Sequence, residues 1–219
     1  MIIAALNEEQ FIGQAVASAF ESGALEVILA DGGSSDRTRE IGSECGARVI
    51  SCERMRSQQF NAAAAAATGN HLIFLHADTT LPAGAADAVH EALSGKAHFG
   101  GFQLRFAEPG IRLRLAEQLI NLRSRITRCP WGDQAQFIDR ATFLAVGGFR
   151  PIPLMEDYAM AVTMKRRGRT LILPMTVTTS GRRFQRKGSI ATIVMNWRII
   201  IAFRLGADPE RLARMYRKE

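Results

Sequence analysis

The fold is decided by the stretch Leu72-Ile73-Phe74-Leu75-His76-Ala77-Asp78-Thr79-Thr80-Leu81-Pro82, in which an apolar run ends abruptly at His-x-Asp. A continuous apolar run of this length predicts a strand that is buried on both faces, like the central strands of parallel sheets. In open α/β sheets, ligands bind beyond the carboxyl ends of the strands. Asp78 therefore stands where a functional carboxylate is expected, although a turn aspartate that caps the next helix also fits.

Upstream of this stretch, short apolar strands alternate with helices. We predict strands at 1–6, 26–30, 48–52 and 72–75, and helices at 8–20, 37–45 and 58–68. Asn7 is expected to cap the first of these helices. The alternation is typical of right-handed βαβ units on a parallel sheet.

Downstream, the pattern is less regular. We predict strands at 99–106, 135–138, 170–173 and 177–179, and helices at 83–93, 111–126, 141–146, 156–167, 190–204 and 209–216. The strand at 99–106 alternates in the way of a half-exposed strand. Since no repeat or linker interrupts the chain, we expect one α/β domain over 1–219, with a mostly parallel central sheet and a basic helical tail from about residue 186.

The charge of the chain is concentrated at its C-terminal end. The 219 residues include 28 Lys+Arg and 21 Asp+Glu, a net charge of +7, and the residues from Arg182 onward hold ten basic and three acidic side chains. The first 181 residues are therefore balanced. This distribution argues against a nucleic-acid-coating surface and favours a local basic face that meets phosphates or anionic lipid.

Cysteine usage and hydropathy indicate a cytoplasmic protein. Cys45, Cys52 and Cys129 show no metal-binding spacing, and an odd count favours reduced thiols over a disulfide framework. No basic leader segment precedes Ile2, and no apolar run reaches the length that spans a bilayer.

Acidic residues recur where strands or loops end. Asp31, Asp78 and the pair Glu156-Asp157 all occupy such places. Each also has a structural explanation: Asp31 precedes a glycine-rich turn, and the pair at 156–157 suits the first turn of a helix. His76 alone is more typical of a hydrogen-bonded structural histidine.

Taken in chain order, these pieces resemble the family 2 glycosyltransferases of the GT-A fold. The matching segments are 3–9, 27–38, 74–79, 147–149 and 155–157. The chain looks most similar to a small, single-domain bacterial branch of this family. The resemblance implies an enzyme that moves a sugar from a nucleoside diphosphate, usually UDP, to an acceptor hydroxyl with inversion of the anomeric centre.

The resemblance also implies which residues hold the donor. Asp31 matches the carboxylate that accepts a hydrogen bond from the base, and Arg56, Gln59 and Asn61 match a polar helix start beneath the nucleotide. The nucleotide-binding set is Ala5, Asn7, Glu8, Asp31, Arg56, Asn61, His76 and Ala77.

Asp78 matches the last carboxylate of the DxD motif, which holds Mn²⁺ or Mg²⁺ against the diphosphate. The first carboxylate is missing, because His76 stands in its place and is expected to contact the ribose or the metal. Asp157 matches the general base that deprotonates the acceptor.

Further positions are expected to bind the acceptor or a phosphate. They are Trp131, Asp133, Gln134, Glu156, Arg182 and Arg183. The QxxRW motif of processive synthases is absent, and Arg182-Arg183 stands near its place, which disfavours long-polymer synthesis. A solvated basic turn at Arg182-Arg183 and a core position for Trp131 are the structural alternatives.

The helix at 190–204 carries one apolar face. Its members are Ile190, Ile193, Val194, Trp197, Ile201 and Leu205. Two interpretations stay open: packing on the domain or on a homodimer partner, and peripheral binding to an anionic membrane that presents a lipid-linked acceptor.

Two other function classes remain. The eroded DxD motif also fits a catalytically silent module that binds a nucleotide or an anionic partner, which would not need Asp157. A dinucleotide enzyme is disfavoured, since Asn7-Glu8-Glu9 stands where a G-x-G-x-x-G motif would follow the first strand.

Overall fold

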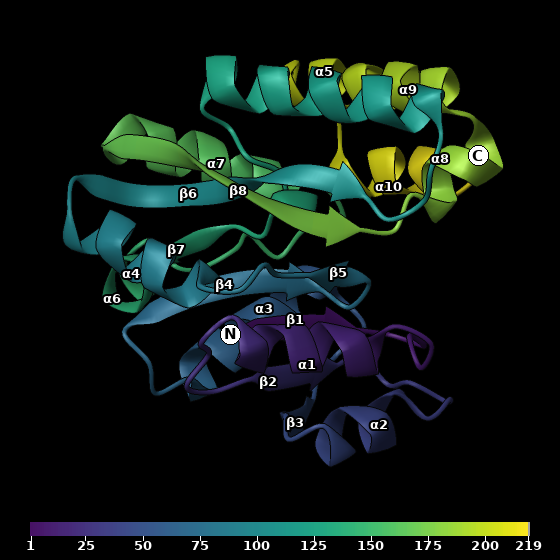
Figure 1. Ribbon diagram of the computed structural model, residues 1–219. Helices are drawn as coiled ribbons and strands as arrows, with labels where there is room; N and C mark the ends of the chain where they lie inside the picture. The colour runs from purple at the N-terminus through teal and green to yellow at the C-terminus, as the bar shows by residue number, and fades with distance from the viewer. Residues whose placement is uncertain (219) are drawn as a thin grey trace.

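The computed structural model describes residues 1–218, except for the side chains of 187, 190, 217 and 218. A single eight-stranded sheet runs through the molecule in the order β3-β2-β1-β4-β7-β6-β8-β5 (Figure 1). The strands are β1 (Ile2–Ala5), β2 (Ile28–Asp31), β3 (Arg48–Ser51), β4 (His71–His76), β5 (Thr79–Thr80), β6 (Ala97–Phe106), β7 (Phe137–Asp139) and β8 (Arg169–Thr179).

The N-terminal half of the sheet has the expected parallel topology. Strands β3, β2, β1 and β4 are parallel neighbours, with Ala5 opposite Asp31 and Ala4 opposite His76. Strand β7 is antiparallel to both β4 and β6, whereas β6 and β8 are parallel to each other. The polar residues that follow β1, β2 and β4 therefore meet at one edge of the sheet.

Helices cover both faces of the sheet. They are α1 (Ile12–Glu21), α2 (Thr38–Glu44), α3 (Arg56–Ala66), α4 (Ala85–Ser94), α5 (Ile111–Thr127), α6 (Arg140–Ala145), α7 (Glu156–Arg167), α8 (Arg182–Lys187), α9 (Ser189–Arg204) and α10 (Pro209–Lys218). Alternate residues of a strand point to opposite faces. Accordingly, Ile3 packs in a core cluster with residues of α1 and α4, and Ile2 packs in another with residues of α3, α7 and α9.

The C-terminal helices belong to this second core. Met195 and Ile199 of α9 and Leu212 of α10 are buried in the same cluster as Ile2 and Phe74. The first of the C-terminal helices, α8, begins at Arg182, close to the expected start of the tail at about residue 186, and α9 and α10 pack on the domain. No helix within the described residues is both long enough and apolar enough to span a membrane.

Two local predictions were wrong, and a third holds only in part. The strand at 99–106 is buried at every residue from Phe99 to Phe102, and it alternates as a half-exposed strand only from Gln103 to Phe106, where Arg105 is exposed. The two strands predicted at 170–173 and 177–179 are one strand, β8, which shifts register around Pro174. Asn7 does not cap a helix: α1 begins at Ile12, and Asn7 is left-handed with a φ of 55°.

Candidate active site

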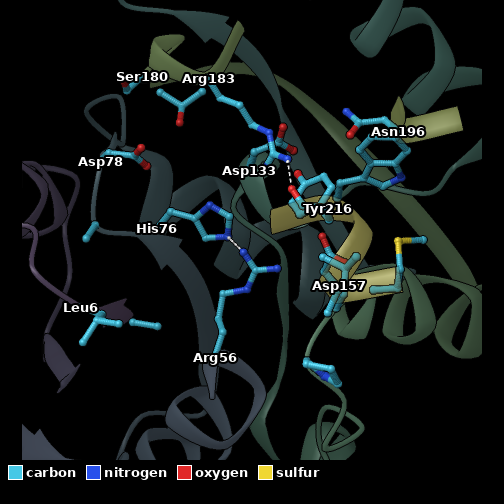
Figure 2. A pocket seen from close by; sticks show the side chains of 18 of the residues that line it. Leu6, Arg56, His76, Asp78, Asp133, Asp157, Ser180, Arg183, Asn196 and Tyr216 are labelled. Carbon is cyan, nitrogen blue, oxygen red and sulfur yellow. Dashed lines mark hydrogen bonds between the residues drawn. The ribbon is translucent and has the colours of Figure 1, made fainter. Parts of the chain in front are cut away.

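A cavity of about 1260 Å³ opens at the carboxyl ends of β1 and β4. Its walls include Ala5, His76, Ala77 and Asp78 on one side and Asp157 on the other. Figure 2 shows Asp78 and Asp157 well separated, with Arg56 and His76 between them in that view. The apolar run that ends at His76 thus delivers its polar residues into the cavity, as the sequence predicted.

A guanidinium joins two carboxylates on the Asp78 side. Arg182 Nη2 lies 2.6 Å from Glu8 Oε1 and 3.1 Å from Asp78 Oδ2. Burial raises the pKa of Asp78, and the charge of Arg182 opposes that shift. Glu8 Oε2 is buried and has no hydrogen-bond partner among the described residues. The carboxylates of Glu8 and Asp78, which are oxygen ligands of the kind that hard cations prefer, therefore converge on the position of the Arg182 guanidinium.

This donor set fits a divalent cation that shares its shell with a ligand. Among residues 1–218, no group of three or more His, Cys, Asp or Glu side chains is arranged to hold a metal. Mg²⁺ is usually bound by one or two protein carboxylates together with phosphate oxygens and water. Asp78, with Glu8 beside it, meets that requirement only when a phosphate-bearing ligand completes the shell.

His76 is a neutral hydrogen-bonding group. Burial lowers the pKa of His76 to about 3, with the Arg56 charge acting in the same direction and Asp157 opposing it. His76 Nε2 lies 3.4 Å from Arg56 Nη1, and an arginine only donates, so Nε2 accepts and Nδ1 carries the proton. Such a ring offers an N–H to a ligand oxygen through Nδ1.

Adjacent residues 156 and 157 point in different directions, as neighbours on a helix do. Glu156 is buried, accepts from Arg56 Nε and does not line the cavity, so its side chain does not meet an acceptor. Burial opposes the charge of Arg56, but Glu156 and Asp157 outweigh this effect and raise the pKa of Arg56. The prediction of an acceptor-binding Glu156 is corrected to a partner of Arg56.

Asp157 is held at the cavity wall by backbone groups. Its Oδ2 accepts from Gly132 N at 2.6 Å, and its Oδ1 accepts from Tyr158 N at 2.7 Å. A Cβ on Gly132 would stand 3.0 Å from Asp157 Oδ2 and 2.9 Å from His76 Nε2. Only a glycine lets this loop approach both side chains so closely.

The loop before β7 contributes Trp131 and Asp133 to the cavity. Trp131 is half-buried, and the Arg123 guanidinium lies 3.5 Å from the centre of its ring. Burial raises the pKa of Asp133 to about 6 against the opposing charge of Arg123, and Asp133 Oδ1 lacks a hydrogen-bond partner among the described residues. Asp133 is thus a second carboxylate on the Asp157 side.

Gln134 is a structural residue, which corrects its predicted role at the acceptor. It is fully buried and does not line the cavity. Its Oε1 accepts from Ser124 Oγ at 2.6 Å and Trp131 N at 3.2 Å, and its Nε2 donates to Phe102 O at 2.9 Å. These bonds fix the loop that carries Trp131 and Asp133.

Residues of α3 divide between the cavity and the scaffold. Gln59 Nε2 donates to Ala5 O at 2.9 Å and Ala30 O at 2.8 Å, which ties the ends of β1 and β2 together. The amide of Asn61 bonds both N and O of Phe149 at 2.8 Å and does not line the cavity. The prediction of a nucleotide contact for Asn61 is therefore replaced by a scaffold role.

Asn7 and Asp31 also lie outside the cavity lining. Asn7 Oδ1 accepts from Ser35 N at 2.9 Å, which joins the loops after β1 and β2. Asp31 is fully buried, and its Oδ2 accepts from Gly33 N at 3.0 Å and Ser34 N at 2.9 Å. Asp31 Oδ1, however, is buried without a hydrogen-bond partner in the described residues.

The C-terminal helices supply cavity residues that sequence reasoning missed, among them Tyr216, which packs against the predicted residue Arg183, and Asn196. The Arg183 guanidinium lies 3.4 Å from the centre of the Tyr216 ring, and its Nη2 donates to Tyr216 O at 3.3 Å. Asn196 of α9 also lines the cavity (Figure 2). The predicted helix at 209–216 was the available signal, but nothing in its spacing indicates which cavity it would cover.

Comparisons with known proteins bear on the family and the fold of the chain. The sequence signature of glycosyl transferase family 2 matches residues 1–152. No curated protein sequence matches the chain.

Among solved structures, the chain is similar to glucosyl-3-phosphoglycerate synthase from Mycobacterium tuberculosis in complex with Mn²⁺, UDP-glucose and phosphoglyceric acid. The TM-score is 0.64 and the sequence identity 20%, and the match covers 94% of this chain and 79% of that chain. Residues 1–349 of S. aureus TarS give a TM-score of 0.65 and 17% identity over 94% of this chain and 65% of that chain. The chain covers 39% of a longer TarS chain. At such identities the structural likeness shows the fold, which is that of the GT-A glycosyltransferases, and the signature over residues 1–152 shows that the chain belongs to glycosyl transferase family 2.

Proposed function

We propose that this glycosyltransferase moves a sugar from a UDP-linked donor to an acceptor hydroxyl and inverts the anomeric centre. The observation that carries the proposal is the placement of Asp78 and Asp157 on two walls of one cavity of about 1260 Å³. The Asp78 side collects groups that suit a diphosphate, and the Asp157 side collects carboxylates that suit proton transfer.

The donor half is built for an anion. Arg182 lies beside Asp78 and Arg56 lies beside His76, and arginine matches phosphate oxygens well. Asp78 and Glu8 would hold Mn²⁺ or Mg²⁺, which neutralises charge on the departing diphosphate when bound. The mycobacterial synthase structures contain UDP with Mn²⁺ or Mg²⁺, which supports a divalent cation here.

We propose that the N–H at His76 Nδ1 donates a hydrogen bond to an oxygen of the UDP-sugar. A neutral imidazole that already accepts from Arg56 through Nε2 has no lone pair left for a metal. His76 therefore replaces the missing carboxylate as a hydrogen-bond donor to the ribose or phosphate, not as a metal ligand.

We assign recognition of the uracil ring of the donor to Asp31. Its unpartnered, buried Oδ1 is a strong acceptor with an unmet hydrogen bond, which an imide N–H of uracil would satisfy. Since Asp31 is fully buried, this contact requires the turn at 32–35 to shift when the donor enters.

Asp157 is assigned as the general base. In the proposed step, the acceptor hydroxyl gives its proton to an Asp157 oxygen while its own oxygen forms the new bond to the anomeric carbon. The bond from that carbon to the diphosphate breaks, and the diphosphate leaves with the electron pair. Attack opposite the leaving group inverts the centre. The hydrogen bond from Gly132 N keeps Asp157 oriented for this transfer.

The acceptor half has both polar and apolar walls. Trp131 and Asp133 lie near Asp157, whereas Leu154, Ile199 and Ala213 add apolar surface. This mixture favours an acceptor with a hydroxyl group on an otherwise apolar or amphiphilic body. A silent binding module would have no use for an oriented carboxylate at position 157.

The test is calorimetric titration of the protein with UDP, with and without Mn²⁺, followed by measurement of UDP release from UDP-sugars. We expect Mn²⁺ to strengthen UDP binding at least about 10-fold, because a diphosphate near Asp78 and Glu8 otherwise meets like charge. If UDP does not bind under either condition, the proposal of a UDP-linked donor is wrong. If neither Mn²⁺ nor EDTA changes the affinity for UDP, Asp78 does not bind a metal that contacts the diphosphate.

A further inference from the structure

Helix α5 exposes a continuous apolar row on its outer side. The row consists of Ile111, Leu115, Leu119, Leu122 and Ile126. These positions follow helical spacing and occupy one face of the helix. The opposite face, with Leu113, Ala116 and Ile120, is buried in a cluster with residues of β6. Packing on the sheet therefore accounts for the inner face of α5 and leaves the outer row unexplained.

Helix α9 presents a second row. Val194, Trp197 and Ile201 are about half exposed, and Leu205 at its end is 82% exposed. These four residues belong to the predicted apolar face and do not pack on the domain, whereas Ile193, a fifth member of that face, packs against the cluster formed by α5 and β6. The domain is contacted instead by Met195, Ile199 and Ile200, among others. The side chain of Ile190, a further member of that predicted face, lies outside the described residues.

The two rows form one surface, which we call the α5–α9 surface. Helices α5 and α9 contact each other and form the outermost layer on one side of the molecule (Figure 1). Of the twelve large hydrophobic side chains exposed in the described residues, nine lie on this surface. Scattered apolar side chains are ordinary, but a concentration of this kind marks an interaction site.

The charges on the α5–α9 surface identify its partner. The exposed ionised side chains of these helices and their ends are all arginines: Arg112, Arg125, Arg128, Arg198 and Arg204. The one carboxylate in either helix, Glu117, is buried and bonded to Arg114. Two copies meeting through this surface would oppose arginine to arginine without a carboxylate between them. Anionic lipid headgroups, in contrast, complement the arginines while the apolar rows enter the acyl boundary.

We propose that the α5–α9 surface docks the protein on an anionic lipid bilayer. Helix α9 then connects the membrane to the active site, because Thr192, Asn196 and Ile199 on its other side line the cavity. An amphiphilic acceptor would reach the Asp157 half of the cavity along this helix. That last step rests on the proposed function, but the docking itself does not.

The test is flotation of the full chain with vesicles of phosphatidylcholine alone or of equal parts phosphatidylcholine and phosphatidylglycerol. We compare the double variant Leu119→Glu/Ile201→Glu with the control Leu25→Glu. Leu25 is fully exposed and lies in the segment between α1 and β2, two elements that are on the opposite side of the molecule from α5 and α9 in Figure 1. Each variant places glutamate at positions already exposed to water, so folding should be retained.

We expect the wild-type protein to float with the anionic vesicles only, and less so at high salt. The double variant should lose at least about 10-fold in vesicle affinity, since carboxylates would then enter the interface. The control should bind as the wild type does. Arg125→Glu/Arg198→Glu should produce a similar loss on anionic vesicles.

Three outcomes would overturn the proposal: wild type that does not float with anionic vesicles, equal losses in the double variant and the control, or a wild-type dimer that the double variant converts to monomer while vesicle binding is unchanged. The last result would assign the surface to a second copy of the chain. Calorimetric titration of the same variants with UDP separates this test from the donor assignment, because the α5–α9 surface should not affect UDP affinity.

Discussion

The Arg182 guanidinium lies 3.1 Å from the Asp78 carboxylate, at the position where a cation shared with the donor diphosphate is expected. The same nitrogen donates to Glu8. Without a bound cation, this arginine holds two carboxylates together that would otherwise repel each other. A metal that binds there must compete with Arg182 or displace it toward the diphosphate.

Replacing Arg182 with glutamine should strengthen binding of Mn²⁺ alone and weaken binding of UDP alone. Arg182 is half exposed although Asp78 is mostly buried, so solvent screens the pair, and removing the competing charge is worth about 1 kcal/mol, or roughly 5-fold in Mn²⁺ affinity. Calorimetry with each ligand separately measures both effects. Arg37→Gln is a matched control, because Arg37 pairs with Glu40 on an exposed helix outside the cavity lining. Equal responses of the two variants would contradict a cation site at Asp78.

Asp157→Asn should reduce sugar transfer by at least about 10²-fold and leave UDP affinity nearly unchanged, as expected for loss of a positioned base. Asparagine keeps an oxygen that can accept from Gly132 N, so the loop should stay in place. The measurement is UDP release in the presence of acceptor, alongside calorimetry with UDP.

Glu156→Gln is the contrasting variant. Glu156 is buried against Arg56, so its loss should appear as a lower melting temperature, with transfer reduced less than in Asp157→Asn. A larger loss of transfer in Glu156→Gln than in Asp157→Asn would reverse the assignment of the base.

Local pattern predicted where the polar residues would gather. The apolar run of strand length predicted that a strand ends at about His76, where β4 does end. His76 and Asp78 line the cavity because they lie at this strand end. Helical spacing also fixed the start of α7 at Glu156, which separates the directions of Glu156 and Asp157. Such features depend only on the period of each element.

Partners that are distant in the chain could not be predicted in this way. Arg56 meets Glu156 across 100 positions, and Gln134 is buried because Ser124 and Phe102 happen to offer bonds to it. A helix was predicted at 111–126, but its apolar residues occupy both faces, and only the packing on β6 shows which row is left outside. Periodicity gives the faces of an element but not the surface that each face meets.

Asp133 should make the stability of the protein fall as pH rises from about 4 to about 6. Its folded pKa of about 6 exceeds the ordinary value of 3.8, so the folded state holds a proton that the unfolded state has already lost in this interval. Above pH 6 the charged, buried carboxylate opposes folding. Asp133→Asn should therefore raise the melting temperature at pH 8 by a few degrees, at about 2–4 °C per kcal/mol, and change it little at pH 4.

The difference in melting temperature between Asp133→Asn and the wild type separates the contribution of Asp133 to stability from that of His76, which both proteins share. The folded pKa of His76 is lowered to about 3, so His76 makes stability rise with pH up to about its ordinary value of 6.5. The two trends partly cancel in the wild type. A difference between Asp133→Asn and wild type that is the same at pH 4 and pH 8 would show that Asp133 does not titrate near 6.

Tyr216 should affect the acceptor rather than the donor. Its ring packs against Arg183 at 3.4 Å, and burial raises the pKa of its hydroxyl against the charges of Arg183 and Arg56. Tyr216 therefore remains neutral at physiological pH and covers the cavity near Asp133 and Asp157 (Figure 2).

Tyr216→Ala should open this wall, raise the KM for the acceptor and leave UDP affinity within about 2-fold. Tyr216→Phe keeps the ring against Arg183 and removes only the hydroxyl, so it should behave like the wild type unless the hydroxyl itself binds the acceptor. If Tyr216→Ala instead weakens UDP binding and leaves the acceptor KM unchanged, α10 covers the donor half of the cavity.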